Sequence, residues 1–506
     1  MPAARPVALD GLLAEAVRHL APTLALLTEL GGMFEGAGHE LALVGGPVRD
    51  AFLGRGSPDL DLTTSARPEQ IEAITSRWAD AQWDVGRAFG TIGLRKGAEH
   101  IEITTYRADS YDRRTRKPTV SFGDNLTDDL RRRDFTVNAM ALRLPGLSFE
   151  DPYGGLADLA ARRLATPGPA DVSFADDPLR MMRAARFVAQ LGLEIAPPVR
   201  EAMTAMASSL EIVSIERIRE ELVKLILAEE PRAGLRVFVD TGLAQYVLPE
   251  LPGMRLTTDE HRRHKDVYEH SLTVLDQAIM LESTPGTDPD AGAVPGPDLT
   301  LRLAALLHDV GKPATRRFGA DGGVSFHHHE LVGATLTKKR LRALRFDKET
   351  IRDVTRLVEL HLRFHGYASG EWTDSAVRRY VTDAGPLLPR LHRLTRADCT
   401  TRNPRKAARL QRTYDELENR IAELSEAEEL KKVRPELDGH EIGQVLGIPP
   451  GPALGRAYQF LLAVRLDRGP IGKDAARQAL LDWWAGQPAS RERAPINPTG
   501  AAPRAE

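Results

Sequence analysis

Two aspartates separated by one residue, Asp59 and Asp61, are the side chains best suited to catalysis in this chain of 506 residues. They belong to the segment DLDL, where a strand with a period of two places both carboxylates on one face and Leu60 and Leu62 on the other. Neighbouring carboxylates repel each other unless a cation neutralises them, and hard oxygen ligands at this spacing suit Mg²⁺. The pair therefore predicts a magnesium site that acts on phosphate groups, with a solvated edge strand as the alternative.

A glycine turn precedes the acidic pair. The segment LALVGGPVRDAFLG predicts an apolar strand, a Gly-Gly turn and a helix with Pro47 in its first turn. Backbone N–H groups at such a helix start can hold phosphates, and Gly46 and Arg49 lie there. An ordinary strand-to-helix turn is the alternative. Further along, RRRDFTVNA begins with three arginines, which form either a second phosphate clamp or a solvated face, after a charged stretch at 106–119 that is typical of a mobile basic loop.

A helix that can read a base is predicted in FADDPLRMMRAARF. Asp177 precedes Pro178 and suits a simple N-cap. Arg180, Arg183 and Arg186, however, recur every three residues along one side of the helix. A carboxylate accepts hydrogen bonds and a guanidinium donates them, so an Asp177/Arg180 pair would accept cytosine and adenine and reject guanine and uracil.

A second chemical site is predicted in the C-terminal half, where ten of the 14 histidines fall between His261 and His392. Neutral imidazoles and carboxylates suit a divalent transition metal, although a single helical histidine is more often a core residue. The candidates resemble the four ligands of an HD-domain phosphohydrolase: His270, His308, Asp309 and Asp398, with His329 and His361 as further ligands or substrate contacts.

The elements that position these groups divide the chain into an α/β part and a helical part. Short alternating strands mixed with helices run from about residue 40 to 145, and amphipathic helices dominate beyond about 151. We expect these divisions: a helical lead-in (1–35), an α/β head that carries the acidic pair (36–165), a helical neck for base reading and RNA binding (166–255), an HD-type metal-binding domain (256–400), a helical tail domain (401–487) and a disordered tail (488–506).

Composition narrows the class of protein. The single cysteine, Cys399, excludes an intrachain disulfide and fits a reducing cytoplasm. The apolar stretches near the start are interrupted by charges, so we expect no membrane partner. A net charge of −3 does not exclude RNA, which needs only a basic surface. Two groups of basic residues either grip RNA phosphates or form a solvated helix face: Arg217, Arg219 and Lys224, and Arg402, Arg405, Lys406, Arg409 and Arg412.

Six segments in order resemble the class II tRNA nucleotidyltransferases, the bacterial-type CCA-adding enzymes: GGPVRD, DLDL, RRDFTVNA, DPYGGLADL, DDPLRMMRAARF and SIERIREEL. The resemblance implies an α/β polymerase-β-like nucleotidyltransferase head followed by an all-α body including an HD-type helical domain. It implies that Asp59 and Asp61 are catalytic and bind Mg²⁺. It also implies a set of nucleotide-binding residues: Gly46, Arg49, Arg133, Asp177, Arg180, Arg183 and Arg186. Asp176 stands where the family often has Glu.

The implied activity is template-independent addition of CCA, from CTP and ATP, to the 3′ end of tRNA. The resemblance also implies a divalent transition metal in the HD domain and a phosphohydrolase activity there, with nucleotides or 2′,3′-cyclic phosphate ends as substrates. Alternatives are a poly(A) polymerase, whose Arg-Phe-Arg-Leu type segment is replaced here by GRAFGTIGL (86–94), and a CC-only or A-only enzyme. A third alternative is an HD phosphohydrolase with an RNA-binding head, which predicts missing metal carboxylates. The oligomeric state is not predicted.

Overall fold

A computed structural model describes most of the chain and divides it into two compact units, residues 1–252 and 253–506. The described residues are 9–56, 59–84, 87, 90–109, 120–123, 125–255, 266–282, 296–318, 324–364, 373–399, 404–428 and 433–487. Outside them lie most of the expected basic loop at 106–119, the expected tail at 488–506, Arg402, and residues 86, 88 and 89 of GRAFGTIGL.

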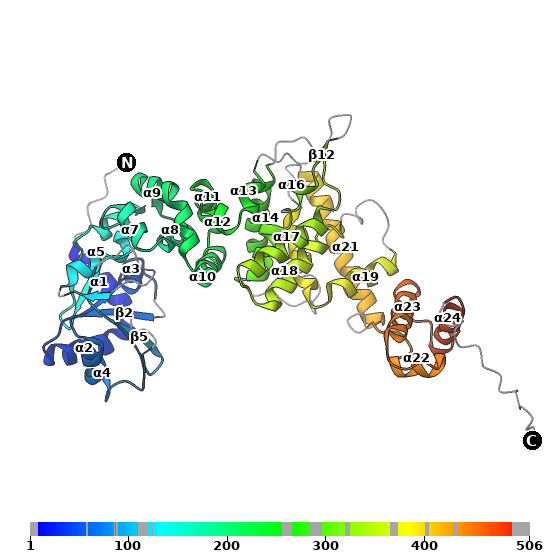
Figure 1. Cartoon of the computed structure of the whole chain (residues 1–506), viewed down its shortest axis with the longest axis horizontal. Coiled ribbons are helices and arrows are strands. Elements are labelled where there is room, and N and C mark those ends of the chain that lie inside the picture. The colour runs from blue at the N-terminus through cyan, green and yellow to red at the C-terminus, as the bar shows by residue number, and fades with distance from the viewer. Residues whose placement is uncertain are drawn as a thin grey trace, which may run out of the picture. The chain divides into compact units, whose positions relative to one another are not determined.

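The first unit is built on a seven-stranded sheet with the order β3-β4-β5-β2-β1-β8-β9 (Figure 1). Within it β2 and β5 run parallel, and the other neighbouring pairs run antiparallel. Its strands are β1 (Leu41–Val44), β2 (Asp59–Thr64), β3 (Ala81–Trp83), β4 (Thr91–Lys96), β5 (Glu99–Thr105), β8 (Ala141–Leu144) and β9 (Ser148–Glu150). The strands expected from the alternating segments are present, while β3 and β9 are short additions at the sheet edges.

Helices of the head lie before, between and after the strands, with the small hairpin β6 (Arg107–Asp109) and β7 (Val120–Phe122). They are α1 (Leu9–His19), α2 (Ala21–Gly36), α3 (Gly46–Phe52), α4 (Pro68–Thr75), α5 (Leu126–Arg131), the 3-10 helix η2 (Thr136–Asn138) and α6 (Gly155–Ala160). Helix α4 packs on β4 and β5, where its Ile71 is buried. On β1, Ala42 and Val44 instead pack with Leu126 and Leu130 of α5.

The neck is helical apart from a two-stranded parallel sheet formed by β10 (Arg163–Leu164) and β11 (Glu194–Ile195). Its helices are α7 (Ala170–Asp176), α8 (Leu179–Leu191), α9 (Pro197–Met206), η3 (Ala207–Ile212), α10 (Ile215–Ile226), α11 (Pro231–Asp240), α12 (Ala244–Val247) and α13 (Glu250–Gly253). Helix α8 packs against both α10 and α11. The expected helices at 178–191 and 215–228 are therefore confirmed within two residues.

The second unit begins with the histidine-rich helices, among which lies the short hairpin β12 (Arg317–Phe318) and β13 (Val324–Ser325). Its helices up to residue 398 are α14 (Val267–Leu281), α15 (Leu299–Leu307), α16 (Lys312–Thr315), α17 (His329–Ala343), α18 (Lys348–Leu360), α19 (Asp374–Ala384), η4 (Gly385–Leu387) and α20 (Leu388–Asp398). No helix in the ranges given above is long and apolar enough to cross a membrane.

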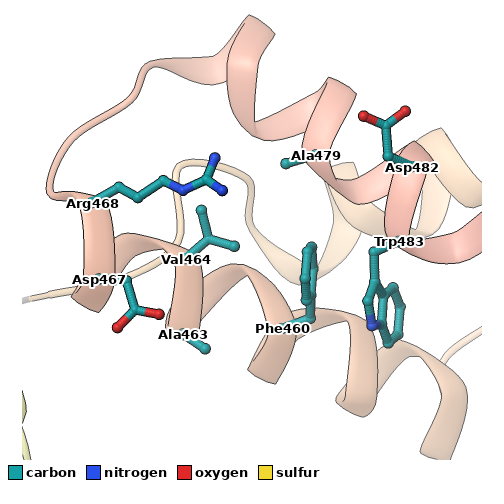
Figure 2. Close-up of a pocket in the computed structure, with 8 residues that line it drawn as sticks. All are labelled: Phe460, Ala463, Val464, Asp467, Arg468, Ala479, Asp482 and Trp483. Carbon is teal, nitrogen blue, oxygen red and sulfur yellow. The ribbon is translucent and has the colours of Figure 1, made fainter.

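The last helices are α21 (Pro404–Glu428), α22 (Gly439–Leu446), α23 (Pro452–Arg468) and α24 (Lys473–Ala485). Helices α22 to α24 share a small core around Ile442, Leu461 and Leu480. Figure 2 shows a pocket of about 500 Å³ between α23 and α24, where the rings of Phe460 and Trp483 stack with centroids 4.8 Å apart.

The crossing of α8 and α11 depends on Gly234, and this gives a test of the fold. A Cβ at Gly234 would lie 2.3 Å from the carbonyl oxygen of Ala185 and 2.5 Å from Leu225 Cδ1. Gly234→Ala should therefore destabilise the first unit by about 1–3 kcal/mol, because backbone must move. Gly32→Ala is the matched control, since nothing lies within 4 Å of a Cβ at this position of α2. Thermal unfolding should show a lower midpoint for the first variant only; equal midpoints would contradict the packing.

Candidate active site and metal centre

The acidic pair lies on β2 as its alternation predicts. Asp59 is exposed and Asp61 half-buried, while Leu60 and Leu62 between and beyond them are fully buried. On the parallel neighbour β5, Glu102 is directly opposite Asp61, so three carboxylates share one face of the sheet. The register of the two strands thus places Glu102 beside the pair.

Charges around Asp61 define the electrostatics of this face. Burial raises the pKa of Asp61, as does the nearby Asp59, while Arg133, Arg183 and Arg49 oppose the shift. Burial also raises the pKa of Glu102, with Asp61 and Asp59 adding to the effect. Oxygen ligands that crowd together at a partly desolvated place are a donor set that fits a hard divalent cation.

The glycine turn holds an arginine against the backbone. Gly45 adopts φ +74°, and a Cβ there would lie 2.9 Å from Arg133 Nη1, so only glycine suits this position. Gly46 begins α3, and Pro47 occupies its first turn as predicted. Arg49 is nearly buried and donates to Asp50 and, at 2.6 Å, to Asn138 Oδ1. The turn therefore brings Arg133 and Arg49 to the side of the sheet next to β1.

Asp134 joins the sheet region to the arginine helix α8. Its carboxylate accepts from Arg183 Nε at 2.8 Å, from Asn138 Nδ2 at 3.0 Å and from the backbone of Phe135 at 2.9 Å. Burial alone would raise the pKa of Asp134, but Arg183 and the hydrogen bonds from Asn138 and Arg183 lower it to about 2. Asp134 is therefore ionised at neutral pH and fixes the guanidinium of Arg183 over the head.

Asp177 and Arg180 each contact other residues in the structure, and their role as a base-reading pair stays a prediction. Asp177 accepts from the backbone of Leu179, as an N-cap does, and pairs with Arg217 of α10 at 2.7 Å. Arg180 instead donates to Ser173 Oγ at 2.8 Å and to the carbonyl oxygen of Arg132 at 2.6 Å. The two side chains therefore bind different segments, Asp177 the helix α10 and Arg180 the helix α7 and the backbone at Arg132.

The other two arginines of the stripe have different surroundings. Arg183 Nη1 lies 3.6 Å from Glu221, and its guanidinium acts electrostatically on both Asp61 and Asp177. Arg186 is buried, where it donates to Glu221 Oε2 at 2.6 Å and to Gln190 at 2.7 Å. Arg186 thus ties α8 to α10, and its predicted contact with the nucleotide stays a prediction. The charge of Arg183 therefore acts on Asp61 and on Asp177.

Six side chains of the second unit converge on one buried site, including the four predicted ligands. The carboxylate of Asp309 lies between two groups of histidines: its Oδ2 is 3.2 Å from His308 Nε2 and its Oδ1 is 3.2 Å from His329 Nε2. Two sets of three ligand atoms each lie within 4.8 Å of one another: His270, His308 and Asp398, and Asp309, His329 and His361. His329 and His361 are thus ligand candidates of equal standing.

The histidines are oriented for metal binding by backbone carbonyls. The Nδ1 atoms of His308, His329 and His361 lie 2.9, 2.8 and 2.6 Å from the carbonyl oxygens of the residues three before them. These contacts leave the Nε2 atoms for a ligand. Within the described part of the chain, none of these three buried Nε2 atoms makes a hydrogen bond. Buried and aligned acceptors of this kind fit a transition metal.

Asp134, Asn138 and Glu221 were missed by sequence reasoning. Asp134 and Asn138 stand inside the quoted segment RRRDFTVNA, and Glu221 inside SIERIREEL. The one signal in the sequence was the spacing of Asp134 and Asn138, which are four residues apart in a segment with no helical period. The partners of Asp134 and Glu221 on α8 lie 49 and 35 residues away in sequence, so these contacts could not be predicted from the sequence.

Three parts of the chain match known families. Residues 41–165 match the Poly A polymerase head domain, residues 192–254 match the probable RNA and SrmB-binding site of polymerase A, and residues 267–403 match the HD domain. The sheet with its acidic pair and the histidine-rich site fall within the first and third matches. These features define a nucleotidyltransferase with a poly A polymerase head and an HD domain.

Relatives with named activities show which kind of nucleotidyltransferase the chain resembles. The chain is 34% identical over 451 residues to the A-adding tRNA nucleotidyltransferase of Deinococcus radiodurans. The aligned residues make up 88% of this chain and 95% of that protein. It is 40% identical over 268 residues to the CCA-adding enzyme of Latilactobacillus sakei, and it spans 66% of that protein's length. The fold is similar to that of the Bacillus stearothermophilus CCA-adding enzyme in complex with CTP, with a TM-score of 0.63 and 23% identity over 94% of this chain and 99% of that one.

The chain belongs to the tRNA nucleotidyltransferase family of the bacterial CCA-adding type, as the order of its motifs predicted. The expected fold class is also confirmed, with β10 to β13 as small additions to a body expected to be all-α.

The contact between Asp134 and Arg183 gives the first test of the site. Asp134→Asn should destabilise the association of α8 with the head by about 1–3 kcal/mol, because it removes the closer of the two carboxylates that pair with Arg183, whose side chain is 32% exposed. Hydrogen exchange of α8 should speed up accordingly. Glu229→Gln is the control, since the Glu229 side chain is 82% exposed.

The stabilisation from Asp134 should depend on pH with a defined sign. Because folding lowers the pKa of Asp134 from 3.8 to about 2, the contribution is fully present well above 3.8 and is lost as the pH falls through about 2. The exchange difference between wild type and Asp134→Asn should therefore be constant near neutral pH and shrink in acid. A difference that grows on acidification would contradict the assignment.

Proposed function

We propose that this protein adds CCA to the 3′ end of tRNA, using CTP and ATP and no nucleic-acid template. The observation that supports it is the position of Arg183, which acts on both Asp61 and Asp177. A single nucleoside triphosphate can therefore reach the acidic pair with its phosphates and the head of α8 with its base. We also propose that the domains of the chain have the bounds predicted from the sequence and that the protein is located in the cytoplasm.

The proposed reaction is in-line attack of the tRNA 3′-hydroxyl on the α-phosphate of the incoming nucleotide, with pyrophosphate leaving. Asp59 and Asp61 would hold Mg²⁺, which neutralises the developing charge and lowers the pKa of the attacking hydroxyl. Glu102 is a third carboxylate on the same face. An RNA-binding head without catalysis has no use for three carboxylates in this arrangement.

Arginines of the head would hold the triphosphate. Arg133 lies against Gly45 at the phosphate turn, and Arg49 stands behind it with Asn138 and Asp50 as partners. Gly46 would contribute its backbone N–H at the start of α3. Because Asp134 fixes Arg183 by two hydrogen-bonding nitrogens, this guanidinium is positioned before the nucleotide arrives.

Asp177 and Arg180 would read the base after a change of partners. Asp177 exchanges Arg217, whose side chain is 51% exposed, for the amino group of cytosine or adenine. Arg180 sits one turn further along α8 and would donate to the ring nitrogen. Guanine and uracil present a carbonyl oxygen to Asp177 and leave a desolvated polar group unpaired, which disfavours them.

A-only addition is the second candidate, because the Deinococcus relative that aligns over nearly its whole length is named as A-adding. Poly(A) addition is a further alternative that shares the same head. Incubation with tRNAs that lack one, two or three terminal nucleotides, each with CTP, ATP or both, separates them by product length. CCA addition restores all three ends; A-only activity extends only the tRNA that lacks one nucleotide; a long tail identifies a poly(A) polymerase.

The acidic pair should be essential for whichever addition occurs. Asp59→Ala and Asp61→Ala should each lower the rate of nucleotide incorporation by about a thousandfold or more, because charge on the phosphate is no longer neutralised. Glu69→Ala is the control: Glu69 lies on α4, which packs on β4 and β5 from the other face of the sheet. Wild-type rates in either aspartate variant would remove the proposal.

We further propose that the histidine-rich site binds divalent transition metal and hydrolyses phosphodiesters, with nucleotides or 2′,3′-cyclic phosphate ends as substrates. The two oxygens of Asp309 face different histidines, which supports two ions that share this carboxylate. Lys312 Nζ lies 2.8 Å from Asp309 and adds a positive charge beside the site. A phosphate group would be attracted there.

Metal content tests this site without any activity assay. Elemental analysis of purified protein should find two ions per wild-type chain, none in the His308→Ala and Asp309→Ala double variant, and one in His329→Ala. His440→Ala is the control, since this exposed histidine contacts Gln444 on α22. Unchanged metal content in the double variant, or phosphodiester hydrolysis that survives it, would contradict the site.

A further inference from the structure

One row of residues crosses the sheet from the acidic pair to its far edge. Asp61 is opposite Glu102, Glu102 is opposite Gly93, and Gly93 is opposite Trp83 on β3. Residues directly opposite each other on paired strands present their side chains to the same face. Trp83 therefore lies on the catalytic face, two strands beyond Glu102.

Trp83 lies flat on the backbone of Gly93. A Cβ at Gly93 would be only 2.0 Å from the indole Nε1 and 2.2 Å from Cε2, so the absence of a side chain there lets the ring cover the strand. Trp83 is half-buried, with part of its ring open to solvent. The glycine thus fixes the ring parallel to the sheet instead of letting it project away.

His100 extends this aromatic surface toward Asp59. The His100 ring lies 6.0 Å from that of Trp83, and its residue is opposite Asp59 on β2. His100 is exposed. The two rings are tilted by 54° to each other, so Trp83 offers the flat surface of this aromatic platform and His100 forms its edge. Arg95, opposite His100 on β4, adds a cation to the same face.

The geometry of the reaction decides what approaches this platform. Gly45, Arg133 and Arg49 place the phosphate-holding groups on the β1 side of the acidic pair. In-line displacement needs the attacking hydroxyl on the side opposite to the departing pyrophosphate. The RNA end must then approach from the side of β5, β4 and β3, whose other face is covered by α4.

We propose that Trp83 and His100 stack the 3′-terminal base of the RNA acceptor and so place its 3′-hydroxyl beside the carboxylates. This inference rests on the proposed nucleotide addition and identifies the subsite for its second substrate. Stacking suits the task because the terminal base changes after each addition, and every base presents a π-face to an aromatic ring.

The test compares enzyme and RNA changes together. RNA minihelices ending in cytidine, or in a ribose with hydrogen in place of the terminal base, are extended by wild type, Trp83→Ala, Trp83→Phe and His100→Ala. Wild type should show a KM for the base-less RNA roughly tenfold higher than for the intact RNA. Trp83→Ala should abolish this difference and leave the KM for CTP unchanged, while Trp83→Phe should retain it. Loss of the platform's edge in His100→Ala should reduce the difference.

Gln82→Ala is the matched control, because Gln82 is the neighbour of Trp83 on β3 and its side chain hydrogen-bonds Thr75 of α4 on the opposite face. This variant should discriminate as wild type does. A Trp83→Ala enzyme that still discriminates tenfold, or that is impaired equally with both RNAs, overturns the proposal.

A binding measurement separates this inference from the proposed function. With a fluorescent pyrrolocytosine as terminal base and no nucleoside triphosphate present, wild type should quench the fluorescence and Trp83→Ala should not. If quenching occurs but no nucleotide is added, the proposed function fails while the subsite stands. If nucleotides are added and quenching does not depend on Trp83, the subsite alone is overturned.

Discussion

The contact between the buried Asp134 and the half-buried Arg183 holds the candidate active site together. It connects the segment after α5 with a helix 49 residues later in the chain, and Asn138 extends it to Arg49 on α3. An ionised carboxylate in such a position is stable only while its partners surround it. The head therefore holds α8 at one place, where Arg183 acts on both Asp61 of β2 and Asp177 at the start of the helix.

Local periodicity was enough to predict the groups that are rigid parts of one element. The period of two in DLDL places Asp59 and Asp61 on one face of β2, and Leu60 and Leu62 are buried beneath them. The histidine-rich site was predicted from His308 and Asp309, which are neighbours at the end of α15; the structure brings their side chains together, and metal binding there stays a prediction. In both cases the chemistry needs residues whose spacing is set by the backbone itself.

Contacts between distant segments could not be predicted in this way. The pairing of Asp177 with Arg217, in place of Arg180, depends on where α10 crosses the end of α8. Arg186 follows the helical stripe but is buried, because α10 brings Glu221 to it. Trp83 had no detectable role in the sequence, since its relation to Asp61 exists only through the registers of three strand pairs.

The proposed reaction requires one nucleotide to span the acidic pair and the head of α8. It is tested most directly by single-turnover incorporation of CTP and UTP by wild type and Asp177→Ala. A shared compartment predicts that the variant keeps Mg²⁺-dependent incorporation but loses about tenfold or more of its preference for CTP over UTP. An undiminished preference in Asp177→Ala would show that the base is read elsewhere, and would contradict the account.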